Sequence, residues 1–151
     1  MNADNDAVIS TLNDLVETCR DGEEGFRTAA ESVKNTELRA LFTRISQERA
    51  QCAAELQKEI RRLGGDPDIS GSVAGAIHRG WMNLKSVVTG DDHAIITEAE
   101  RGEDFSVKNF EEALKNDLPN DIFIVVNQQY QQVKKAHDQI RSLELSTSTA
   151  R

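Results

Sequence analysis

The chain has 151 residues, a net charge of −8, 38% hydrophobic and 29% charged residues, a composition typical of one folded, water-soluble domain. No apolar run approaches the ~20 residues that cross a bilayer, and phosphate backbones repel an acidic surface, so we expect neither a membrane nor a nucleic-acid partner. The first residues lack the basic segment and apolar core of a signal peptide, which predicts a cytoplasmic protein.

The first two predicted elements are helices over residues 5–33 and 37–63, where apolar residues recur every three or four positions. Asn35 and Thr36 interrupt the first helix and cap the second. Gly64 and Gly65 end the second helix, and Pro67 prevents its continuation. The pattern predicts a tight helical hairpin over residues 5–63.

Residues 66–90 differ in composition from what precedes them. Four glycines are scattered through this stretch, and one short amphipathic piece runs over residues 73–88. We predict a long crossover that contains a short helix.

The next predicted elements are helices over residues 92–116 and 121–145. Asp91 or Asp92 caps the first of them, and Leu118-Pro119-Asn120 forms the turn, because proline cannot continue a helix. The sequence thus predicts a second hairpin over residues 92–145, followed by a flexible tail over residues 146–151.

The two hairpins resemble each other at a constant offset. Residues 19–24 match residues 99–104, and residues 60–63 match residues 140–143, each 80 positions apart. Two hairpins joined by a long crossover make an all-α, ferritin-like four-helix bundle of two pseudo-repeated halves. We expect a pseudo-two-fold axis that places Glu23 over Glu103.

Polar residues interrupt the apolar stripes near the middle of the bundle. Counting from the two turns places Glu23, Glu48 and Glu103 at similar levels, with His137 about one turn away at ~1.5 Å per residue. Glu98 is a secondary candidate, because it could converge with Glu103 and His137.

Two explanations for this polar level stay open. One is a buried polar layer, in which the glutamates bond to Arg49, Gln129, Gln132 or water, because a stranded buried carboxylate is costly. The other is a site for iron or manganese, because carboxylates on facing helices with a histidine suit these metals.

No phosphate loop, nucleophile elbow or paired-cysteine knuckle occurs in the sequence, so no catalytic residue is predicted. Cys19 and Cys52 fall at similar distances from the first turn and could be neighbours. Free cysteines usually pack as small core residues, and a redox pair is the alternative.

Several pieces of the sequence together carry a family resemblance. They are Glu48-Arg49, Glu55-Leu56, Leu63-Gly64-Gly65-Asp66-Pro67, His78-Arg79-Gly80-Trp81, Glu98-Ala99-Glu100-Arg101-Gly102-Glu103-Asp104 and Ala136-His137-Asp138-Gln139-Ile140-Arg141-Ser142-Leu143. In their order and spacing, the chain resembles the bacterial ferritin-like family called domain of unknown function 2383. The resemblance covers about residues 4–145 and implies a ferritin-like fold without an established activity.

The chain departs from the metal-binding ferritin and rubrerythrin relatives at their ligand motif. Those relatives carry Glu-x-x-His on the second and fourth helices, whereas this chain has Glu48-Arg49-Ala50-Gln51 and Lys134-Lys135-Ala136-His137. The resemblance therefore implies a single metal or none in place of a di-iron centre.

Three functional hypotheses follow. The first is a non-catalytic, structural or stress-related bundle with a degenerate metal site, assembled as a homodimer or larger because Trp81 and its apolar neighbours need a cover. The second is an iron- or manganese-binding protein or oxidoreductase that uses Glu23, Glu48, Glu103 and His137. The third is a partner-binding module that uses the crossover face around His78, Arg79 and Trp81.

Overall fold

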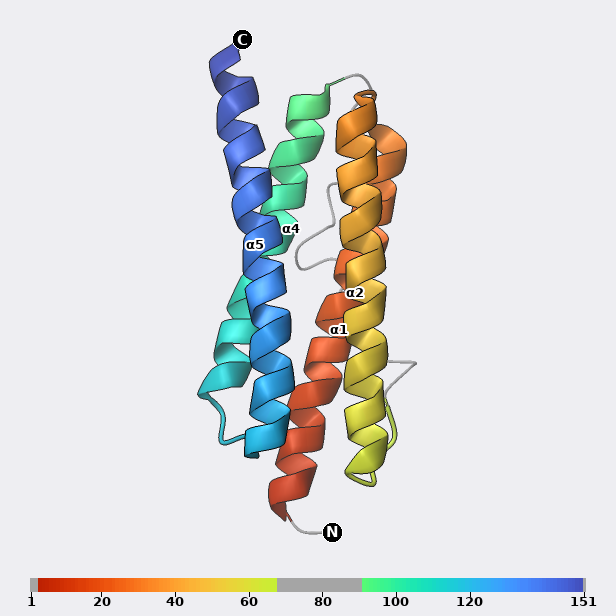
Figure 1. Cartoon of the computed structure of the whole chain (residues 1–151), viewed down its shortest axis with the longest axis vertical. Helices are drawn as coiled ribbons and strands as arrows, with labels where there is room; N and C mark the ends of the chain where they lie inside the picture. Colours follow the sequence, from red (N-terminus) through yellow and green to blue (C-terminus); the bar gives the residue numbers. More distant parts are fainter. Residues whose placement is uncertain (1–2, 68–90, 151) are drawn as a thin grey trace.

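The computed structural model describes residues 3–67 and 91–150, with side chains over residues 5–67 and 91–146. Within those ranges it contains four helices and no strand: α1 (Ala3–Ser32), α2 (Thr36–Arg62), α4 (Asp92–Lys115) and α5 (Asn120–Ala150). They lie side by side in one elongated bundle (Figure 1). None of these described helices is both long enough and apolar enough to cross a membrane.

The helices are arranged as two antiparallel hairpins. α1 packs along α2, α4 packs along α5, and α1 also lies against α4. Because α2 and α4 run in the same direction, the end of α2 and the start of α4 lie at opposite ends of the bundle (Figure 1). The predicted short helix of the crossover lies outside the described residues.

Local signals in the sequence explain the helix ends. The Asn35 side chain accepts a hydrogen bond from the Leu38 backbone N–H at 2.9 Å and caps α2. Gly64 follows α2 with a φ of 89°, a left-handed conformation that favours glycine. At the opposite end of the bundle, the Asp92 carboxylate accepts from the backbone N–H groups of Lys34 and Asn35, each at 2.9 Å. This contact ties the start of α4 to the turn of the first hairpin.

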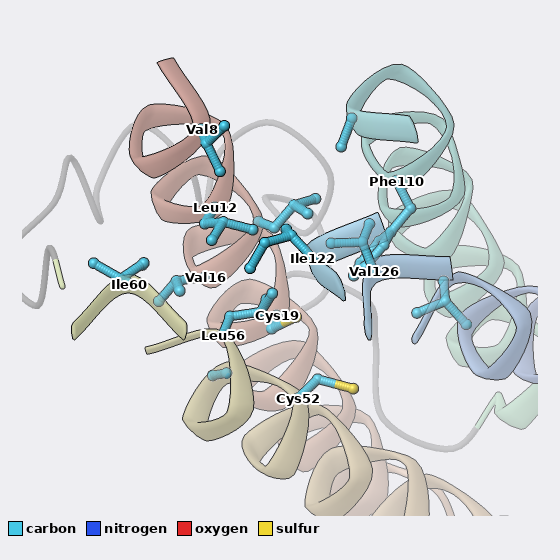
Figure 2. Close-up of a cluster of buried hydrophobic side chains, with 14 residues drawn as sticks. Val8, Leu12, Val16, Cys19, Cys52, Leu56, Ile60, Phe110, Ile122 and Val126 are labelled. Atoms are coloured by element: carbon cyan, nitrogen blue, oxygen red, sulfur yellow. The ribbon is translucent and has the colours of Figure 1, made fainter. Parts of the chain in front are cut away.

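The buried side chains form two apolar clusters, one toward each end of the bundle. The first contains Leu12, Leu56 and Phe110, and Figure 2 shows that it also holds both cysteines. The second is built around Phe26 and Phe42, whose rings lie 5.7 Å apart between centroids. Burial of these two clusters supplies the main stabilisation of the bundle, since removing apolar surface from water is the dominant favourable contribution to folding.

α5 continues to Ala150, past the predicted end at Leu145, because the residues that follow include no glycine or proline to stop a helix. α1 and α4 are neighbours, as a pseudo-repeat requires. The superposition of the two hairpins through a two-fold axis stays a prediction.

Candidate functional site

A fully buried ion pair occupies the middle of the bundle. Arg49 of α2 donates from Nη1 to Oε1 of Glu103 on α4 at 2.7 Å, and from Nη2 to Oε2 of the same carboxylate. The two side chains are 1% and 0% exposed. Paired parallel hydrogen bonds between guanidinium and carboxylate are among the strongest polar contacts in proteins.

α1 provides the space and the platform for this pair. A Cβ at Gly22 would lie 3.1 Å from Nη1 and 3.2 Å from Cγ of Arg49, so a larger residue would press on the arginine. The Phe26 ring lies beneath the guanidinium, with 5.5 Å from Cζ to the ring centroid, a cation–π geometry. Burial lowers the pKa of Arg49, but Glu103 more than offsets this and leaves the pKa above its usual value.

Further polar contacts surround the pair. The Gln129 amide donates to the Cys52 carbonyl at 3.3 Å and to Glu55 Oε1 at 2.9 Å. The Ser46 hydroxyl donates to the Glu23 carbonyl at 2.8 Å. Two buried atoms, Arg49 Nε and Gln129 Oε1, find no hydrogen-bond partner within the described part of the chain. The middle of the bundle is thus a polar layer between two apolar clusters.

The residues predicted as metal ligands are dispersed around this layer. Glu103 is buried, whereas Glu23 is only partly buried. Glu48 is bonded to Arg44 at 3.1 Å with 25% of its side chain exposed, and Glu98 lies 3.6 Å from Arg101. On α2 it is Arg49, one residue and about 100° further around the helix than Glu48, that is fully buried at the centre.

His137 also has different partners from those expected. Its Nε2 lies 2.6 Å from Asp104 Oδ1, and its Nδ1 lies 3.2 Å from Asp138 Oδ1. Burial lowers the pKa of His137, but the hydrogen bonds to Asp138 and Asp104 outweigh it, so the pKa is raised. This arrangement favours the doubly protonated imidazolium, since both ring nitrogens then donate.

The hydrogen-bonded pairs explain why sequence reasoning missed Asp104. Three of the hydrogen bonds that join α4 to α5 pair Glu100 with Arg141, Asp104 with His137, and Glu111 with Tyr130. The midpoint of each pair lies near residue 120, whereas the sequence-based prediction measured positions from the turn at Leu118. This register shift sets His137 level with Asp104, which lies one position beyond the buried Glu103.

A second feature missed by the sequence analysis is a carboxyl pair between α4 and α5. Glu100 and Glu144 share a hydrogen bond, and burial together with this neighbour raises the pKa of Glu100 to about 7. The same hydrogen bond lowers the pKa of Glu144. The sequence signal for this pair is a partly buried glutamate on each helix, but matching the two requires the register between α4 and α5.

The centre suits a guanidinium better than a metal ion. Among the described residues, no three histidine, cysteine, aspartate or glutamate side chains come close enough together to hold a metal. Both carboxylate oxygens of Glu103 already accept from Arg49, so a cation would have to displace the arginine to reach them. The metal-ligand roles of Glu23, Glu48, Glu98, Glu103 and His137 stay predictions.

Comparisons with other proteins bear on the family and the fold. A family model described as Domain of unknown function (DUF2383) matches residues 7–116. No curated protein matches the sequence.

Two solved structures resemble this one along nearly its whole length. A two-domain protein from Anabaena variabilis, containing DJ-1/ThiJ/PfpI-like and ferritin-like domains, is 16% identical, with a TM-score of 0.78 over 97% of this chain. This chain spans only 38% of that protein. A mutant of Mycobacterium smegmatis Dps1 is 13% identical, with a TM-score of 0.77 over 95% of this chain and 99% of that one. The likeness confirms the ferritin-like four-helix fold.

Proposed function

The chain belongs to the family described as domain of unknown function DUF2383, and from this premise we propose that it is a non-catalytic ferritin-like bundle centred on an ion pair instead of a metal. The observation that carries the proposal is the contact between Arg49 and both carboxylate oxygens of Glu103. The guanidinium neutralises the buried carboxylate, which is the task that a metal ion performs for clustered glutamates.

The role that we propose is structural. Arg49 and Glu103 come from α2 and α4, which belong to different hairpins, and their bonding requires both helices to be in register. A buried ion pair contributes little net stability but penalises arrangements that separate its members. The pair would therefore select one packing of the two hairpins, in a cytoplasmic protein with a structural or stress-related role.

We also propose that the bundle assembles with further copies of itself. Among the side chains that the structure describes, four large apolar ones are exposed: Phe105, Phe123, Ile124 and Leu145, at 38% to 57%. We expect a second copy of the chain to cover these side chains, because assembly removes exposed apolar surface from water. Light scattering should give a mass of at least twice the 16.8 kDa of one chain, and a monomer would contradict assembly. The partner-binding alternative at His78, Arg79 and Trp81 lies outside the described residues and stays a prediction.

Elemental analysis and melting curves test the metal-free centre. Protein purified without a metal-affinity tag should contain far less than one iron or manganese per chain. Its melting temperature should not change with a chelator or with either added metal, because only a bound ligand stabilises the native state by mass action.

The matched variants are Glu103→Gln and the partly exposed control Glu48→Gln. Glu103→Gln should lower the melting temperature equally with and without metal, since the loss comes from Arg49 and not from a ligand. Stoichiometric metal in the wild type, or a metal-dependent rise in melting temperature that Glu103→Gln abolishes, would overturn the proposal in favour of the iron- or manganese-binding alternative.

A further inference from the structure

The two cysteines of the chain are neighbours in the core. Cys19 on α1 and Cys52 on α2 are free thiols with 0% and 2% exposure, and they lie on adjacent turns of the two helices (Figure 2). Their thiols hydrogen-bond to each other. The Cys52 thiol also lies 3.3 Å from Oε1 of Gln132, a residue of α5 that is exposed to solvent.

These contacts form a polar chain from the core to the surface. Cys19 can donate to Cys52, and Cys52 can donate to Gln132, whose amide reaches solvent. Two cysteines that only filled apolar space in the core would not require the contact between Cys52 and Gln132. The Cys52 thiol therefore lies one hydrogen-bonded side chain away from solvent.

The surroundings of the two sulfur atoms are electrostatically different. The hydrogen bond from Cys19 lowers the pKa of Cys52 against the opposing effect of burial, and the positive charge of Arg49 lowers it further. The hydrogen bond to Cys52, followed by burial, raises the pKa of Cys19. Cys52 is therefore the more readily ionised of the two thiols, and the thiolate is the nucleophilic form of cysteine.

We propose that Cys19 and Cys52 form a dithiol site that reduces small peroxides and becomes a disulfide joining α1 to α2. The Cys52 sulfur attacks one peroxide oxygen; the S–O bond forms, the O–O bond breaks, and the leaving hydroxide takes the thiol proton as water. The Cys19 sulfur then attacks the Cys52 sulfur; the S–S bond forms, and the sulfenic oxygen leaves as a second water with the Cys19 proton. Two electrons pass from the thiols to the peroxide.

The first experiment treats the native protein with one to a few equivalents of hydrogen peroxide. The chain should lose both free thiols and two hydrogen atoms in mass, and dithiothreitol should restore them. Trypsin cleaves after Arg20, Arg49 and Lys58, so the oxidised digest should contain residues 1–20 joined to residues 50–58. Thiols that survive peroxide in the native protein but react in urea would overturn the proposal, as would disulfides only between chains.

Serine variants assign the two roles. In Cys19→Ser, peroxide should produce a sulfenic acid on Cys52 that dimedone traps. In Cys52→Ser, Cys19 should react about tenfold more slowly than the wild-type pair, since Cys19 is fully buried and burial raises the pKa of its thiol. Equal rates in the two variants would refute the assignment. If a serine variant does not fold, Gln132→Leu provides the same test, because closing the polar route should slow thiol loss while leaving reactivity in urea unchanged.

Discussion

The substitution Glu103→Gln should lower the stability of the bundle. The glutamine keeps the volume of the side chain, so no cavity forms, but the charge that balances Arg49 disappears. Arg49 is 1% exposed and cannot turn to solvent without moving α1, where Gly22 and Phe26 enclose it. Removing one member of a buried pair costs about 3–5 kcal/mol. A chain of this size loses ~2–4 °C of melting temperature per kcal/mol, so the expected fall is about 6–20 °C.

The assay is thermal and urea unfolding followed by far-UV circular dichroism, with the partly exposed Glu48→Gln as the control. That control should lose no more than about 1 kcal/mol, because it removes only a partly exposed ion pair with Arg44. The paired substitution Arg49→Met with Glu103→Leu should recover most of the loss, because apolar replacements of buried ion pairs are often neutral or stabilising by about 1–4 kcal/mol.

Equal stabilities for Glu103→Gln and Glu48→Gln would refute the buried pair as the centre of the bundle. A carboxylate among other carboxylates gains from losing its charge, whereas a carboxylate bound to a guanidinium does not.

Three further predictions concern Gly22 beside the pair, the carboxyl pair of Glu100, and the tie between the hairpins at Asp92. Gly22→Ala should destabilise the bundle by roughly 1–3 kcal/mol despite the better helix propensity of alanine, because the new Cβ meets Arg49, and the loss should shrink in an Arg49→Met background. Glu100→Gln should flatten the pH dependence of stability. The folded-state pKa of Glu100 is raised from 4.5 to about 7, so between these values the folded wild type binds more protons than the unfolded chain and loses stability as the pH rises. A plot of the free energy of unfolding against pH that ran parallel for the variant and the wild type would contradict this. Asp92→Ala should lower the free energy of unfolding by about 1.5–3 kcal/mol, because two backbone N–H groups lose a charged acceptor. Asp92→Asn should recover part of this loss. Urea unfolding that shows no loss for Asp92→Ala would rule out the tie between the hairpins.

Helices and turns could be predicted from the sequence because their causes are local. Apolar spacing placed all four described helices to within a few residues, and Asn35, Gly64 and Pro119 marked where the chain turns. The ferritin-like class followed from two hairpins joined by a long connection. The end of α5 was missed because an exposed tail without glycine or proline carries no local stop signal.

The candidate site was predicted only in part, because it depends on angles and registers between helices. The sequence placed Glu103 inside and named Arg49 as one available partner for the glutamates. Only the tertiary structure decided that α2 turns Arg49, and not Glu48, toward the centre, since a rotation of one residue exchanges the two. It also set the register that brings His137 to Asp104. Chain spacing determines which residues share a helix face, but the packing of neighbouring helices determines which charges meet.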